Sequence, residues 1–102
     1  MGVWTFGSPR VGDERFAGDY AAALGSRTWR VTHSHDIVPS VPIRVMGFHH
    51  VPTEVFYNEA GDDLKVCDAE GEDPTCSDGE WTHASIVDHL YYLNIYICGC
   101  NI

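Results

Sequence analysis

The stretch that decides the fold is residues 3–32, which read VWTFGSPRVGDERFAGDYAAALGSRTWRVT. Val3–Phe6 is a short apolar run, and two glycines and a proline mark a turn directly after it. Asp13 can cap a helix over about 14–24, because apolar residues recur there every three or four positions. Residues 28–32 have the pattern of a second strand. A strand, a helix and a strand within about 30 residues predict a parallel β-α-β unit and therefore an α/β fold.

The downstream half predicts further strands and one more helix. Strands are expected at Thr53–Tyr57 and Leu64–Cys67. Between about Ala84 and Ile97 the apolar residues lie four, three and four positions apart, which predicts a C-terminal helix. The dense apolar run Leu90–Cys98 also fits a buried strand, so this alternative stays open. We therefore expect residues 1–102 to form one small α/β domain.

Composition excludes several classes of function. The net charge is −9, with 15 acidic residues against six Lys and Arg, which disfavours binding to nucleic acid and to anionic membranes. No apolar run reaches the ~20 residues of a membrane span. The chain also begins without the charged start and apolar stretch of a signal peptide, so none is expected in it.

An acidic segment lies in the middle of the second half. Residues 59–80 contain nine acids and a single base, which is typical of a solvated loop. The alternative is a calcium site formed by Asp68, Glu70 and Glu72. This pattern is a weak match to an EF-hand, because Asp73 stands where such a loop needs glycine.

Four cysteines bear on the cellular compartment, namely Cys67, Cys76, Cys98 and Cys100. They form no C-x-x-C pair and have no histidine at zinc-finger spacing, so we expect no metal and no cofactor. Cys67 and Cys76 flank a loop rich in Gly, Asp and Pro, which favours a disulfide and an oxidising compartment. Four free, partly buried thiols in a cytosolic protein remain the alternative.

Two residues stand out as candidates for chemistry. Asp36 follows the second strand, and ligands of open parallel sheets bind beyond the carboxyl ends of the strands. His89 comes 53 residues later, and Asp followed by His is the order that α/β-hydrolases use after their serine. Spacing alone leaves the ordinary roles open, which are a turn cap for the aspartate and a core position for the histidine.

Four motifs together resemble the fungal class 3 lipases and the related feruloyl esterases. They are TFGSPRVG at 5–12, RVTHSHDIVP at 30–39, GFHH followed by EVFY within 47–57, and DHLYY at 88–92. They occur in the family's order over nearly the whole chain. The family often has Asn where His35 stands, which is a departure next to the expected acid.

The resemblance implies the C-terminal part of an α/β-hydrolase sheet from a secreted hydrolase of lipids or other esters. In that family His89 would be the general base and Asp36 the residue that orients it, in an acyl-enzyme mechanism. Val38, Val41 and Ile43 could line an acyl pocket, although ordinary packing explains them equally well. The substrate would be a lipid or another carboxylic ester.

The nucleophile is missing from the 102 residues, which contain no G-x-S-x-G. Ser8 follows a glycine near a strand end, but Pro9 has no N–H for the oxyanion hole. We therefore expect the N-terminal half of the domain, with its nucleophile elbow, to be the partner of this chain, and the 102 residues alone to be inactive. The alternative is a non-catalytic binding domain derived from a lipase.

Two further expectations concern structure rather than catalysis. His49, His50 and Glu54 are predicted to form a structural hydrogen-bond network. The family resemblance implies that Cys100, near the C-terminus, would pair with a cysteine near the N-terminus of the whole domain. No partner of that kind stands in this chain.

Overall fold

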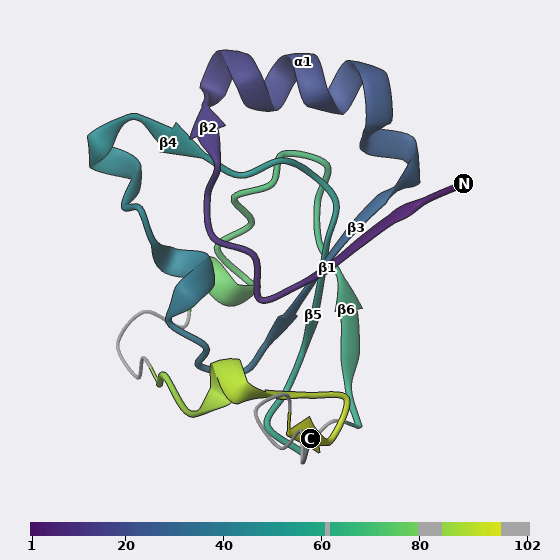
Figure 1. The fold of residues 1–102 in the computed structure, drawn as a ribbon, viewed down its shortest axis with the longest axis vertical. Helices are drawn as coiled ribbons and strands as arrows, with labels where there is room; N and C mark the ends of the chain where they lie inside the picture. Colours follow the sequence, from purple (N-terminus) through teal and green to yellow (C-terminus); the bar gives the residue numbers. More distant parts are fainter. Residues whose placement is uncertain (61, 80–84, 97–102) are drawn as a thin grey trace, which may run out of the picture.

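The computed structural model of the chain describes residues 1–60, 62–79 and 85–96 (Figure 1). One α-helix, several short strands and several single 3₁₀ turns make up these residues. The helix and strands are β1 Val3–Phe6, β2 Gly12–Asp13, α1 Glu14–Leu24, β3 Thr28–His33, β4 Phe48–His49, β5 Glu54–Tyr57, β6 Leu64–Val66, β7 Tyr91–Tyr92 and β8 Ile95–Tyr96. The 3₁₀ turns are Gly25–Arg27, Val38–Ser40, Arg44–Met46, Ser77–Gly79 and Asp88–Leu90.

The main sheet has the strand order β1-β3-β5-β6. β1 and β3 are parallel, β3 and β5 are parallel, and β6 joins β5 antiparallel. Because α1 lies between β1 and β3 in the chain, the predicted β-α-β unit is confirmed. The four strands of this sheet fall within one residue of their predicted positions. The α/β fold is therefore correct, and the carboxyl ends of β1, β3 and β5 point to the same edge.

Helix α1 begins and ends where its sequence predicts. The side chain of Asp13 accepts a hydrogen bond of 2.8 Å from the backbone N–H of Phe16, which satisfies a free donor of the first turn. Glu14 adds a negative charge at the same end, where the helix dipole favours it. Ala17 packs its small side chain into the interior. Neither α1 nor another helix within the described ranges is long and apolar enough to cross a membrane.

The predicted C-terminal helix is wrong for the residues that the structure describes between 85 and 96. The segment forms a 3₁₀ turn at Asp88–Leu90 and then the hairpin of β7 and β8. The physical reason is the two-residue turn between the strands, because Leu93 and Asn94 adopt φ values of 53° and 62°. Positive φ at both central residues gives a hairpin turn that suits the twist of the strands. Spacing did not reveal the turn, since the same apolar residues fit a helix and a hairpin.

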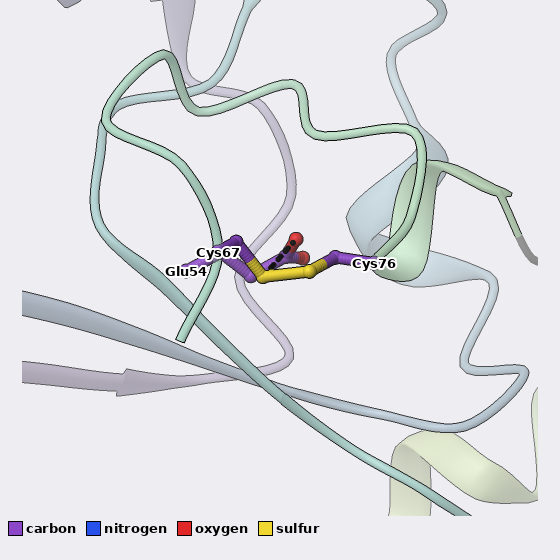
Figure 2. A group of neighbouring side chains, drawn as sticks. All are labelled: Glu54, Cys67 and Cys76. Carbon is purple, nitrogen blue, oxygen red and sulfur yellow. Dashed lines mark hydrogen bonds between the residues drawn. A yellow bond between two sulfur atoms is a disulfide. The ribbon is translucent and has the colours of Figure 1, made fainter. Parts of the chain in front are cut away.

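The predicted disulfide between Cys67 and Cys76 is present, with 6.4 Å between the two Cα atoms (Figure 2). It closes the loop that carries Glu72 and Asp73. Both of these acids are only 8% exposed, so the expectation of a fully solvated acidic loop is wrong there. Cys98 and Cys100 lie outside the described residues.

Candidate active site

The turn after β3 brings Asp36 and His89 together. Asp36 and Ser85 form a short parallel bridge, in which the N–H of Ile37 donates to the Ser85 carbonyl over 3.1 Å. Figure 1 shows the segment that begins at residue 85 passing the ends of β3 and β5. Nδ1 of His89 lies 2.9 Å from Oδ2 of Asp36, so the expected contact between the two side chains is present. The structure thus joins two residues that stand 53 positions apart.

The carboxylate of Asp36 is buried and held by three donors. Its side chain is 1% exposed. Oδ1 accepts a hydrogen bond of 2.8 Å from the backbone N–H of Val38. Oδ2 accepts from the Tyr92 hydroxyl over 2.5 Å as well as from His89. Burial and the contact with Asp36 raise the pKa of Tyr92, so its hydroxyl remains a donor across the physiological range. Three fixed donors leave this carboxylate little freedom to rotate.

His89 has one ring nitrogen engaged and one available. Its side chain is 27% exposed, so the ring reaches the surface. If Nδ1 donates its proton to Asp36, Nε2 carries the lone pair of the neutral ring. Nε2 forms no hydrogen bond with any residue in the described ranges. This is the arrangement that a general base requires.

Gly7 closes the site from the end of β1. Its φ is +69°, and a Cβ built there would lie 2.7 Å from Nδ1 of His89 and 2.8 Å from Oδ2 of Asp36. A side chain therefore does not fit without displacing the pair. The sequence marked Gly7 only as a turn residue and gave no role to Tyr92. Both stood inside motifs that carried the family resemblance, which was the one signal that could have found them.

The three predicted acyl-contact residues lie on the loop that follows Asp36. Val38 is half-buried, whereas Val41 and Ile43 are 39% and 37% exposed. Ile43 helps to line a groove of about 280 Å³ that is formed mainly by Arg10, Ser40, Ile43, Arg44, Val45 and Asp78. Contact of these three residues with a substrate remains a prediction.

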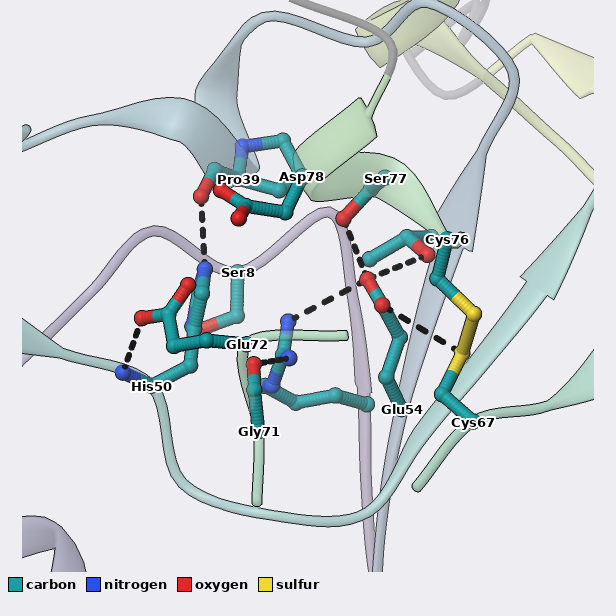
Figure 3. Close-up of polar contacts among 12 residues, drawn as sticks. Ser8, Pro39, His50, Glu54, Cys67, Gly71, Glu72, Cys76, Ser77 and Asp78 are labelled. Carbon is teal, nitrogen blue, oxygen red and sulfur yellow. Dashed lines mark hydrogen bonds and ion pairs between the residues drawn. A yellow bond between two sulfur atoms is a disulfide. The ribbon is translucent and has the colours of Figure 1, made fainter. Parts of the chain in front are cut away.

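Glu54 and His50 both form structural hydrogen bonds, as predicted, but each does so with partners of its own (Figure 3). Glu54 is 1% exposed and accepts hydrogen bonds from the hydroxyls of Thr32 and Ser77, while an Arg30 nitrogen lies 3.9 Å away. Burial raises the pKa of Glu54 even though these partners oppose the shift. His49 is only partly buried, and its Nδ1 lies 2.9 Å from the His50 carbonyl oxygen.

His50 is an imidazole locked in its neutral form. Its Nε2 donates to the Pro39 carbonyl over 2.6 Å, and the ring is buried. Burial lowers the pKa of His50 to about 3, and the nearby charge of Arg30 adds to the shift. His50 therefore serves as a neutral donor, which is a structural task and not the task of a base.

Within the described residues, the side chains that could hold a metal have other partners. Glu54, Cys67 and Cys76 bring one possible ligand atom each within 4.8 Å of one another. Both sulfurs are consumed in the disulfide, so neither offers a thiolate (Figure 2). Oε1 of Glu54 lies 3.3 Å from the sulfur of Cys67, which carries no proton and makes only a packing contact. Glu72, which the calcium alternative would use as a ligand, binds Arg10.

Comparisons with known proteins identify the relatives of this chain. The family model for class 3 lipases matches residues 1–46. A lipase from Rhizopus niveus is 35% identical over 100 residues, which is 98% of this chain and 25% of that protein. The secreted mono- and diacylglycerol lipase 1 of Fusarium solani is 36% identical over 74 residues, covering 65% of this chain and 22% of the relative.

Solved lipase structures are similar to this chain in fold. A solved structure described as "a serine protease triad forms the catalytic centre of a triacylglycerol lipase" superposes with a TM-score of 0.82 at 32% identity. The match covers 93% of this chain and 36% of that one. The chain is therefore a homologue of the fungal class 3 lipases and spans between about a quarter and a third of the length of these relatives.

Proposed function

We propose that this chain supplies the acid and the base of a Ser-His-Asp triad in a secreted carboxylic ester hydrolase that acts on lipids. The observation that carries the proposal is the 2.9 Å contact between His89 and Asp36, at the carboxyl edge of a sheet shared with the lipases. Nε2 of His89, which has no hydrogen-bond partner among the described residues, supports it further, since this atom has to face the nucleophile.

The chemistry follows from the geometry of the pair. Nε2 of His89 takes the proton of the serine hydroxyl as its oxygen attacks the ester carbonyl, and then delivers that proton to the leaving alcohol. The resulting acyl-enzyme is hydrolysed by water, which His89 activates in the same way. Asp36 keeps the ring in the tautomer with Nδ1–H and stabilises the imidazolium that forms in each step.

The serine of this triad belongs to the upstream part of the domain. Ser8 is a poor substitute, because its hydroxyl donates to the Pro9 carbonyl over 3.1 Å and Pro9 offers no N–H to an oxyanion. We infer that the 102 residues alone do not hydrolyse esters.

The natural partner of the chain is that upstream half. Among the described strands, β1 pairs only with β3, and its residues Trp4 and Phe6 are 58% and 46% exposed. An open edge with exposed aromatic rings favours pairing with another strand. The Cys67–Cys76 disulfide and the secreted Fusarium relative support a secreted full-length protein.

The test uses the chain together with the upstream part of its reading frame, which we call the extended protein. We expect it to hydrolyse tributyrin and p-nitrophenyl esters, to lose this activity in His89→Ala, and to keep it in Ser8→Ala. The 102-residue chain should hydrolyse neither substrate. An inactive extended protein with a cooperative unfolding transition would contradict the proposal and favour the non-catalytic binding domain.

A further inference from the structure

Arg10 is a buried cation whose guanidinium is fully hydrogen-bonded. It is 5% exposed, and each of the five N–H groups of an arginine has an acceptor here. Nε and Nη2 donate to the two oxygens of Glu72, each over 2.8 Å, and Nη2 also donates to Asp78 over 3.0 Å. This is a bidentate, charge-assisted pair of the strong kind.

The remaining donors of Arg10 go to the loop that carries the three predicted acyl-contact residues. Nη1 donates to the carbonyls of Ser40 and Pro42 over 2.7 and 3.0 Å. The backbone N–H of Arg10 donates to the carbonyl between them, that of Val41, over 2.9 Å. One residue therefore binds three consecutive carbonyl groups of this loop.

His50 extends the row by one residue and shares an acceptor with Arg10. Its Nε2 donates to the Pro39 carbonyl, while its backbone N–H donates to Oε2 of Glu72 over 2.8 Å (Figure 3). The carbonyls of residues 39–42 thus each accept a hydrogen bond from Arg10 or His50, and Glu72 accepts hydrogen bonds from both of these residues. We call Arg10, Glu72 and His50 the carbonyl clamp.

The disulfide loop delivers Glu72 to the clamp. Glu72 lies within the loop closed by Cys67 and Cys76. Gly71 lets this loop approach closely, because its φ is +85° and a Cβ there would lie 2.4 Å from the His50 carbonyl oxygen. Burial alone would raise the pKa of Glu72, but the hydrogen bonds from Arg10 and the His50 N–H lower it to about 2. The clamp therefore keeps its charges across the physiological range.

We propose that the carbonyl clamp is a positioning device for residues 38–43, so that the disulfide loop determines which acyl groups the enzyme accepts. The inference rests on the proposed function, since an acyl group has to be present for selection. Two observations link the clamp to this task. Arg10 and Ser40 line the same groove as Ile43, and at the start of the loop the backbone N–H of Val38 donates to the Asp36 side chain. Arg10, Glu72 and His50 are positioning residues, because none of them touches the catalytic pair.

The test compares Glu72→Gln with Glu70→Gln, an exposed glutamate of the same loop, in the extended protein. The amide introduced by Glu72→Gln would point a donor at the N–H groups of Arg10 or His50 and would break the row of contacts. Because the lost hydrogen bond involves a charged group, the ratio of kcat/KM for p-nitrophenyl palmitate over acetate should change about tenfold or more. Hydrolysis of the acetate, which barely needs an acyl pocket, should stay within about threefold.

A second measurement needs no catalysis. In the 102-residue chain, Glu72→Gln should speed amide exchange of Ser40 and Val41, which donate to Ile37 and Val38, about tenfold. Exchange of the Gly7 amide, which follows β1 and donates to the Val31 carbonyl, should not change. If Glu72→Gln fails to fold, both measurements can be made on Arg10→Lys, whose side chain has three N–H donors in place of five. Arg15→Lys is then the control.

The outcomes separate the two proposals. Unchanged exchange at Ser40 and Val41 overturns the clamp. An equal loss of palmitate and acetate hydrolysis overturns its role in selecting the acyl group, since the defect would then lie in the catalytic pair. If the wild-type extended protein folds but hydrolyses neither ester, the proposed function is contradicted, and so is the role of the clamp in selecting the acyl group. Exchange still decides in that case whether the clamp holds residues 39–42.

Discussion

The catalytic candidates Asp36 and His89 and the carbonyl clamp both contain an acid and a histidine, and they differ in which ring nitrogens of the histidine are hydrogen-bonded. At the sheet edge, His89 contacts Asp36 through one nitrogen and is partly exposed, so the other nitrogen is available for proton transfer. In the carbonyl clamp, His50 is buried and spends Nε2 on the Pro39 carbonyl. Residue type alone does not separate the histidine that we propose as a base from the structural one.

The surroundings of the two carboxylates differ in the same way. Asp36 is met by neutral donors and by His89, whose charge changes in the proposed reaction. Glu72 is paired with the permanent charge of Arg10. The partner of Asp36 can gain or lose a proton during a reaction. The partner of Glu72 stays charged, so this ion pair can only stabilise the fold.

The largest effect should come from Asp36→Asn in the extended protein. The amide cannot accept the Nδ1 proton as a carboxylate does and favours the wrong tautomer of His89, so kcat should fall about 10⁴-fold. The matched control is Asp19→Asn on the exposed face of α1, which should leave kcat unchanged. Initial rates with a p-nitrophenyl ester measure both. A loss of less than about tenfold would remove Asp36 from the triad.

Arg10→Ala should have the largest effect on stability. It leaves the buried carboxylate of Glu72 without its cation, which costs ~3–5 kcal/mol in other buried ion pairs. Arg15→Ala, at an exposed position on α1, should change the free energy of unfolding by less than ~0.5 kcal/mol. Urea titrations of the two variants and the wild type give the values. Equal stability of the two variants would show that the clamp is not a buried ion pair.

The pH dependence of the free energy of unfolding should show the lowered pKa of His50. Its pKa is about 3 in the folded chain against 6.5 as the ordinary value, so only the unfolded chain binds this proton between those limits. Stability is then full above pH 6.5 and is lost as the pH falls, with a slope of ~1.4 kcal/mol per pH unit for one proton. Glu72 adds loss in the same direction between pH 4.5 and about 2. Glu54 acts in the opposite direction, because its pKa is raised.

Comparison of variants isolates the histidine from these carboxylates. His50→Gln should flatten the dependence between pH 6 and 4 by about one proton, while the neighbouring change His49→Gln is the control. Urea titrations at several pH values within that window measure the slopes. A slope in His50→Gln equal to that of the wild type would contradict the neutral, buried state of His50.

The smallest effect is expected from Tyr92→Phe, which removes one of three donors from Asp36. A hydrogen bond to a charged acceptor contributes ~1.5–3 kcal/mol, so kcat in the extended protein should fall about tenfold. Tyr96→Phe, on the exposed strand β8, is the matched control. If both variants keep the wild-type rate, the Tyr92 hydroxyl does not help to fix the carboxylate.

Local patterns predicted the strand, helix and strand of residues 3–32 and the cap at Asp13. The pairing of Asp36 with His89 is not local, and it was predicted from the order of the family's motifs. The prediction of a C-terminal helix was wrong, because the apolar spacing fits a helix and a hairpin equally well. The positive φ values of Leu93 and Asn94, which reverse the chain, could not be read from that spacing. The clamp could not be predicted, since Arg10 and Glu72 lie 62 residues apart and an acidic stretch normally favours solvent.

The most direct test of the central claim is covalent labelling of the extended protein with a p-nitrophenyl alkylphosphonate, followed by peptide mapping. We predict one adduct, on the serine of a G-x-S-x-G upstream of these 102 residues, and a large loss of labelling in His89→Ala and Asp36→Asn. An adduct on Ser8, or equal labelling in the wild type and in both variants, would contradict the proposed triad.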